Sequence, residues 1–136
     1  MLKSKTSMRQ LLLSGIVFVC GMAGTVQAAT LTSGVVYGGP SQNHVACGVV
    51  NLSNAPITFV KTEIVGQYQG FLPLNFNNCG HELAPNSMCS FQAAAVREAA
   101  ACKVVIIQAK TDVRGTMVAL GGTAGNPFPL SEADLR

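Results

Sequence analysis

The sequence contains no tryptophan, and charged residues make up only 11% of its 136 residues. Its only histidines are His44 and His81. A catalytic site needs a nucleophile or a metal ion, a base and a charge-stabilising group within a few ångströms of one another. A chain this poor in such groups has little from which to build one, and without tryptophan it lacks the usual platform for sugar stacking. We therefore predict that the protein is not an enzyme, with no catalytic residue, no metal site and no cofactor.

The main enzymatic alternative is a small hydrolase or metal-dependent enzyme. A metal site could combine both histidines with Glu82 or Asp112, but no close ligand spacing supports it. The chain has no Gly-x-Ser-x-Gly nucleophile elbow in residues 29–136, and the glycines of residues 121–125 lack the Lys-Ser/Thr of a phosphate-binding loop. Solvated surface histidines are the simpler interpretation.

The first 28 residues have the layout of a secretory signal peptide. Three basic residues precede an apolar run, and Val26 and Ala28 place small residues at the −3 and −1 positions of a cleavage site before Ala29. The apolar run over residues 11–24 is shorter than the roughly 20 residues that a membrane-spanning helix needs. We expect bacterial Sec-type export to the periplasm or the medium, with no membrane span after cleavage and one domain over residues 29–136.

Removal of this segment changes the charge of the chain. Three of the nine basic residues leave with the signal peptide, so six basic residues face six acidic ones in the mature domain. A nearly neutral domain has no basic patch for nucleic acid or anionic lipid. The sequence thus argues against a nucleic-acid partner.

Four cysteines remain in the mature chain, and an exported chain is exposed to an oxidising compartment. Four cysteines allow three pairings. Cys79 and Cys89 enclose a short segment that contains Pro85, so these two can meet without moving distant strands. We expect that pair, which leaves Cys47 to pair with Cys102, each on a predicted central strand.

Short apolar runs separated by turn residues predict an all-β fold. Three of the expected strands cover residues 44–52, 102–109 and 113–120. The segment 57–67 changes its apolar phase partway, which indicates a bulge or a change of sheet. The alanine-rich residues 93–101 are expected to start extended and then form a loop or one helical turn, and residues 121–136 look like a loose terminus. About seven strands without a convincing helix predict a single, disulfide-stabilised antiparallel β-sandwich.

One stretch of the mature chain carries a family resemblance. It reads Asn51-x-Ser-x-x-Pro-Ile, then an apolar strand, then Cys79-x-x-x-Leu83-x-Pro85-x-x-x-Cys89-x-Phe91. Over residues 45–93 this pattern is similar to the bacterial Ig-like repeats related to the abnormal-spindle and hydin domains. The resemblance implies a seven-stranded Ig-like sandwich used as an adhesive or scaffolding module. It also implies that the asparagine-containing turn follows a core strand.

Partner binding is the function that these observations favour. Phe71, Leu72 and Phe76 are apolar residues in a segment with mixed strand signals, where Pro73 argues for an edge strand or loop. Arg114 is an arginine on an otherwise apolar strand, and either contacts a ligand or braces a loop. We expect an exported, non-catalytic module that binds an unidentified protein through these residues. A surface-fibre subunit assembled by strand exchange is a further alternative.

Overall fold

The computed structural model describes residues 28–108, 113–123 and 126–136, so residues 1–27 of the predicted signal peptide lie outside it. Ten strands and one short 3-10 turn, η1 (Gly39–Ser41), form the described part. The strands are β1 (Ala29–Thr32), β2 (Gln42–Asn51), β3 (Ile57–Gly66), β4 (Gly70–Leu72), β5 (Leu74–Asn77), β6 (Glu82–Leu83), β7 (Met88–Ala94), β8 (Ala100–Ile106), β9 (Val113–Thr123) and β10 (Asn126–Leu135). Within the described ranges, no helix is long and apolar enough to cross a membrane.

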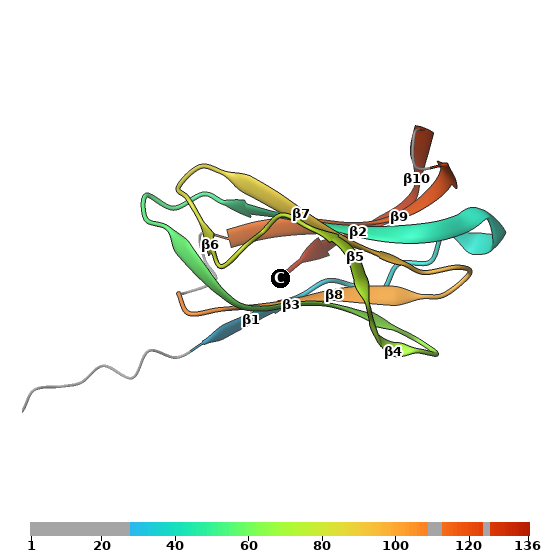
Figure 1. The fold of residues 1–136 in the computed structure, drawn as a ribbon, viewed down its shortest axis with the longest axis horizontal. Coiled ribbons are helices and arrows are strands. Elements are labelled where there is room, and N and C mark those ends of the chain that lie inside the picture. The colour runs from blue at the N-terminus through green and yellow to red at the C-terminus, as the bar shows by residue number, and fades with distance from the viewer. Residues whose placement is uncertain (1–27, 109–112, 124–125) are drawn as a thin grey trace, which may run out of the picture.

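The strands form two antiparallel sheets that face each other as layers (Figure 1). Sheet one has the order β1-β8-β3-β4, with β6 also paired to β3. Sheet two has the order β10-β9-β2-β7-β5. The predicted all-β antiparallel sandwich is confirmed, and the number of strands exceeds seven because short strands flank the main ones.

The core lies between the two layers and follows from the alternation of side chains along each strand. Every second residue of β8, from Ala100 to Ile106, is buried, and Phe91 of β7 is fully buried in the same core. Cys47 of β2 and Cys102 of β8 form a disulfide between the sheets, with a Cα–Cα distance of 6.2 Å. The second disulfide joins Cys79 to Cys89. Both predicted pairs are therefore confirmed.

The phase change predicted for residues 57–67 is a bulge in β3. The register of β3 against β8 shifts between Phe59 and Lys61. Phe59 is buried on one side of the shift and Ile64 on the other, because the extra residue brings both to the core face. The alanine-rich residues 93–101 end β7 at Ala94 and turn before β8 starts at Ala100, as expected for an extended start and a loop.

The prediction of a loose terminus after residue 121 is wrong. β9 continues to Thr123, and β10 pairs with it over most of its length. Pro127 and Pro129 do not prevent this strand, because β10 is an edge strand and an edge position needs no ladder N–H on its outer side. The end of β10 leans across to sheet one, where Arg136 and Thr32 exchange two backbone hydrogen bonds of 3.0 Å.

Candidate functional site

The predicted partner-binding residues of the segment 66–78 do not lie on one surface. The chain crosses from sheet one to sheet two at Pro73, between β4 and β5. Phe71 of β4 is 64% exposed on the outer face of sheet one, and Phe76 of β5 is 46% exposed on sheet two. Leu72 alternates with Phe71 and is only 5% exposed, so it packs in the core and offers no surface to a partner.

Phe76 borders a shallow hollow of about 310 Å³ on the outer face of sheet two. His44 and Leu120 also line this hollow, and Gln92 lies opposite Phe76 in the register of β5 with β7. None of the described residues that line it is an acid, a lysine or an arginine. It gives Phe76 a setting different from that of Phe71.

Arg114 lies on β9 at the edge of a hollow of about 580 Å³. Gly48 and Gly115, where two neighbouring strands carry no side chain, also line this hollow, as do Asp134 and Arg136. One guanidinium nitrogen of Arg114 donates a 3.0 Å hydrogen bond to the carbonyl of Val113. This bond fits the bracing interpretation, and the position at the edge of a hollow fits ligand contact.

The surface around Phe71 brings together side chains from several segments beside one hollow. Val65 of β3 lies opposite Phe71 of β4 on one side and opposite Ala101 of β8 on the other, so the three side chains share one outer face. Val35, which is 71% exposed, lies beyond them. A hollow of about 440 Å³ opens here, and none of the described residues that line it is charged. It is lined by Val35, Val65, Gly66, Gln67, Ala99, Ala100 and Ala101. We call it the neutral hollow.

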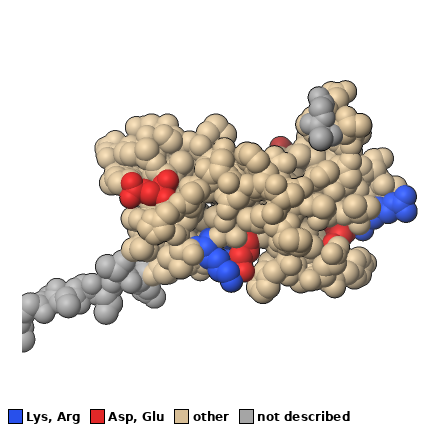
Figure 2. Space-filling model, in the orientation of Figure 1, with Lys and Arg blue, Asp and Glu red and all other residues tan. Residues whose placement is uncertain are grey.

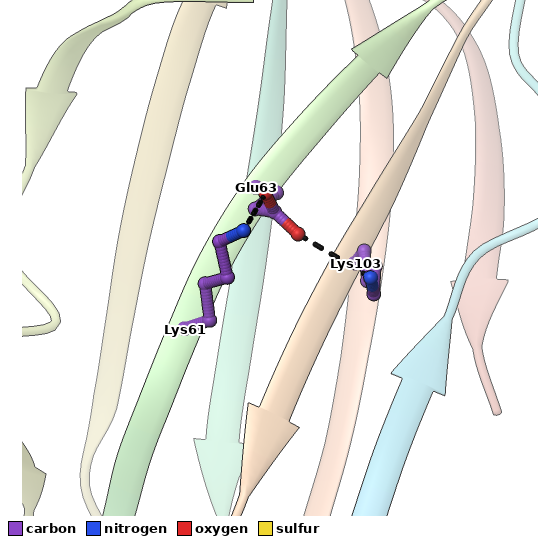
Figure 3. A network of polar contacts seen from close by, with 3 residues as sticks. All are labelled: Lys61, Glu63 and Lys103. Atoms are coloured by element: carbon purple, nitrogen blue, oxygen red, sulfur yellow. Dashed lines mark ion pairs between the residues drawn. The ribbon is translucent and has the colours of Figure 1, made fainter. Parts of the chain in front are cut away.

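A charged network lies on the same outer face, two residues along β3 and β8 from Val65 and Ala101 of the neutral hollow. Figure 3 shows its members, Lys61, Glu63 and Lys103. The Glu63 carboxylate pairs with the ammonium of Lys61 at 2.5 Å and with that of Lys103 at 3.4 Å. The hydrogen bond from Lys61 lowers the pKa of Glu63 and outweighs the opposing effect of burial, so this pKa lies below its ordinary value of 4.5. The Lys61 ammonium also lies 5.1 Å from the ring centre of Phe71. In Figure 2, acidic and basic side chains form only a few small groups, and most of the visible face is uncharged.

A buried carboxylate anchors the turn next to the neutral hollow. Glu98 is 2% exposed and accepts hydrogen bonds from the backbone N–H groups of Tyr68 (2.7 Å) and Gln69 (3.0 Å) and from the Gln69 amide (2.8 Å). Gly66 leaves the space that this carboxylate occupies, since a Cβ at that position would collide with it. The turn between β3 and β4 is thereby held in one conformation, with Tyr68 77% exposed at its tip.

Gln42 connects the segment that contains Glu98 to the loop before β2. Its side-chain amide donates to the carbonyls of Ala95 (2.8 Å) and Glu98 (2.6 Å), and its side-chain oxygen accepts from the N–H of Gly38 (2.6 Å). Gln42 is itself 1% exposed. A fully satisfied buried network of this kind fixes loops relative to one another. It makes this end of the sandwich a rigid support for the exposed side chains near it.

We expect Glu98 to make stability depend on pH. Burial raises the pKa of Glu98, but the three hydrogen bonds outweigh it and leave this pKa below 4.5. A lowered pKa stabilises the fold above the unfolded-state value, and this stabilisation is lost as pH falls through the folded-state value. Glu98→Gln should lower the free energy of unfolding by about 1–3 kcal/mol near pH 7.

Urea denaturation at pH 7 and at about pH 3 tests this prediction, because the wild type should lose more stability on acidification than Glu98→Gln does. Glu63→Gln is the comparison variant, because the pKa of Glu63 is also lowered, chiefly by Lys61. It should likewise lose less stability on acidification than the wild type does. An equal loss in the wild type and in Glu98→Gln would contradict the assignment.

The two histidines lie far apart. Asn51, at the end of β2, contacts the carbonyl of Leu83, which is two residues from His81. His44 is seven residues back along the same strand, which corresponds to about 23 Å. The two histidines therefore cannot share a metal ion in this conformation. Among the described residues, no three His, Cys, Asp or Glu side chains gather in a group that could hold a metal.

No protein-family model, curated protein or solved structure matches this chain. The resemblance to Ig-like repeats of the abnormal-spindle and hydin type therefore stays a prediction. The fold itself defines the class of the protein, which is a disulfide-linked antiparallel β-sandwich.

The sequence interpretation missed the residues that organise the face around Phe71. Val35 lies in an apolar run that looks like a strand, and Glu98 lies in an alanine-rich stretch that looks like a loop. Neither carries a local signal for its role, because Val35 lines a hollow with residues of β3 and β8, and Glu98 holds the turn between β3 and β4. A glycine at the end of a long strand, Gly66, was the one available indication of a close approach.

Proposed function

We propose that this chain is an exported, non-catalytic module that binds a protein partner through the outer face of sheet one. The observation that carries the proposal is two exposed apolar side chains on the outer face of sheet one: Val35, which lines the neutral hollow, and Phe71, which lies opposite Val65 of that hollow. Tyr68 is exposed at the tip of the adjoining turn. Val35, Tyr68 and Phe71 are 71%, 77% and 64% exposed. Large exposed apolar groups gathered on one face mark interaction sites on soluble proteins.

The rigidity of this face supports the proposal. Val65 and Ala101 belong to paired central strands, and Tyr68 belongs to the turn held by Glu98. Side chains that are already ordered in the free protein lose little conformational entropy when a partner binds. Aromatic side chains such as Phe71 and Tyr68 contribute large contact areas and dominate many protein interfaces.

Affinity capture from a periplasmic or culture extract tests the function. Phe71→Ser should reduce retention of a partner by about tenfold or more, as expected for an aromatic anchor. Phe76→Ser is the matched control, because it removes the same side chain from the outer face of sheet two. If no protein is retained, or if both variants retain the same proteins as the wild type, the proposed function is wrong.

Export is the second part of the proposal. The disulfides Cys47–Cys102 and Cys79–Cys89 fit an oxidising compartment outside the cytoplasm. We expect cleavage after Ala28, because this bond follows an apolar segment and small −3 and −1 residues. The intact mass of exported protein should correspond to a chain that begins at Ala29 and contains two disulfides. A mass that retains Cys20, or that includes acyl chains, would contradict it.

A further inference from the structure

The neutral hollow and a lysine lie in line on the outer face of sheet one. Val65 is opposite Ala101, and Glu63 is opposite Lys103, in the antiparallel register of β3 with β8. The two pairs are two residues apart along each strand, which corresponds to about 7 Å. In an extended polypeptide, side chains two residues apart point to the same side with this same spacing. The spacing between the neutral hollow and Lys103 therefore matches the spacing of side chains on one side of an extended polypeptide.

The charged part of this face carries an excess of positive charge. The side chains of Lys61 and Lys103 are 55% and 39% exposed, whereas that of Glu63 is 8% exposed. The two ammonium groups therefore reach solvent, and the one carboxylate between them does not. A partner that approaches this face meets two cations beside an uncharged hollow.

Lys103 lies farther from Glu63 than Lys61 does. Its ammonium forms an ion pair with Glu63 Oε2 at 3.4 Å, whereas the ammonium of Lys61 lies 2.5 Å from Oε1. Charge-assisted N–H···O bonds are commonly about 2.7–2.9 Å. An ammonium has three N–H donors, so Lys103 retains donors for a second carboxylate. Lys61, by contrast, is engaged by Glu63 at 2.5 Å and lies over Phe71.

We propose that this face binds an extended polypeptide segment of a partner protein, with an apolar side chain in the neutral hollow and an acidic side chain, two residues away, on Lys103. The inference rests on the proposed function and names the chemistry of the partner. Charge complementarity selects the acidic residue, and the uncharged lining selects the apolar one. The expected sequence pattern is apolar-x-Asp/Glu.

An extended segment fits better than a membrane or a lipid chain. The mature domain has equal numbers of acidic and basic residues, so it has no net charge to attract an anionic lipid surface. The neutral hollow is an open depression of about 440 Å³ on the face of a sheet. It can receive one or two side chains, whereas a lipid chain needs a longer enclosed cavity.

Selection from a displayed library of random peptides of about twelve residues on the exported, disulfide-bonded protein tests the inference. The enriched peptides should share the apolar-x-Asp/Glu pattern. One enriched peptide is then synthesised, and its affinity is measured by fluorescence polarisation. Ala101→Trp fills the neutral hollow, and Lys103→Met removes the charge but keeps the side-chain stem. Each should weaken binding by about tenfold or more.

Ala46→Trp is the matched control, because Ala46 is a partly exposed mid-strand alanine on the outer face of sheet two. The affinity of the Ala46→Trp variant for the peptide should stay within about twofold of the wild-type affinity, since residue 46 lies away from the proposed face. If Ala101→Trp does not fold, Val35→Asp tests the same hollow from a residue outside the named strands. The effect of Lys103→Met should also shrink as salt concentration rises, because exposed charge pairs are screened.

Two results would overturn the inference. One is a partner retained by affinity capture when no apolar-x-Asp/Glu peptide is enriched, and in that case the proposed function still stands. The other is an enriched peptide whose affinity is unchanged by Ala101→Trp and Lys103→Met. Failure of both affinity capture and peptide selection would contradict the proposed function together with the inference.

Discussion

Replacing Cys47 and Cys102 with alanine is expected to lower the free energy of unfolding by about 4 kcal/mol, on the loop-closure model of disulfide stabilisation. The two cysteines are 55 residues apart in sequence and join the two sheets across the core. The crosslink restricts the unfolded chain over this long loop. A loss of this size is comparable to the whole stability of a small domain. The variant should therefore be largely unfolded at about 37 °C, as small disulfide-dependent domains often are.

The matched comparison is the Cys79→Ala, Cys89→Ala double variant. These cysteines are only 10 residues apart, so the same model predicts a loss of about 3 kcal/mol. Urea denaturation followed by circular dichroism measures both losses. The decisive result is which of the two variants loses more free energy of unfolding. A greater loss in the Cys79/Cys89 variant would show that the short loop, and not the crosslink between the sheets, limits stability.

Replacing Asn51 with alanine is expected to lower the free energy of unfolding by about 3 kcal/mol or more, as for other losses of a buried hydrogen-bond network. Asn51 is fully buried at the end of β2. Its amide nitrogen donates to the carbonyls of Ala55 (2.8 Å), Leu83 (3.1 Å) and Ala84 (3.2 Å). Its oxygen accepts from the backbone N–H (3.0 Å) and the hydroxyl (2.7 Å) of Ser53.

The size of this effect follows from what alanine leaves behind. Carbonyl groups that lose a donor in a buried position pay their full desolvation penalty without compensation. Asn51→Asp separates the two halves of the network, because aspartate keeps the acceptor for Ser53 and loses the donors. We expect Asn51→Asp to be destabilised nearly as much as Asn51→Ala.

Asn75→Ala is the control for this prediction. Asn75 is an exposed asparagine on the edge strand β5, and its loss should change the free energy of unfolding by no more than about 0.5 kcal/mol. Thermal and urea unfolding of the three variants provide the measurement. A small effect of Asn51→Ala would mean that water replaces the amide, and the turn after β2 would then not depend on this side chain.

The sequence by itself predicted the all-β architecture, favoured the disulfide pairing that the structure has, and indicated either a bulge or a change of sheet in the segment that forms β3. These features have local causes. Strand and turn signals alternate along the chain, Cys79 and Cys89 are close in sequence, and the apolar phase changes between Phe59 and Ile64. The role of Asn51 as a turn asparagine was also readable, since the residues after it contain Ser53 and Pro56.

The tertiary structure alone decided where the predicted partner-binding residues point. Phe71, Leu72 and Phe76 are neighbours in sequence, but the crossing at Pro73 places the two phenylalanines on different sheets and the alternation along β4 buries Leu72. β10 forms because the exposed edge of β9 accepts it, although its own sequence contains two prolines. Its pairing depends on a partner strand, so no local propensity predicts it.

The candidate site shows the same division. The neutral hollow combines Val35, Val65 and Ala101, which come from three segments distant in sequence. Glu98 holds the turn at Tyr68 across thirty residues of chain. Residues like these carry ordinary local signals, because their roles arise only when the long-range register of β3 with β8 brings them together. Sequence periodicity reports which face of a strand is buried, whereas register between strands decides which side chains become neighbours.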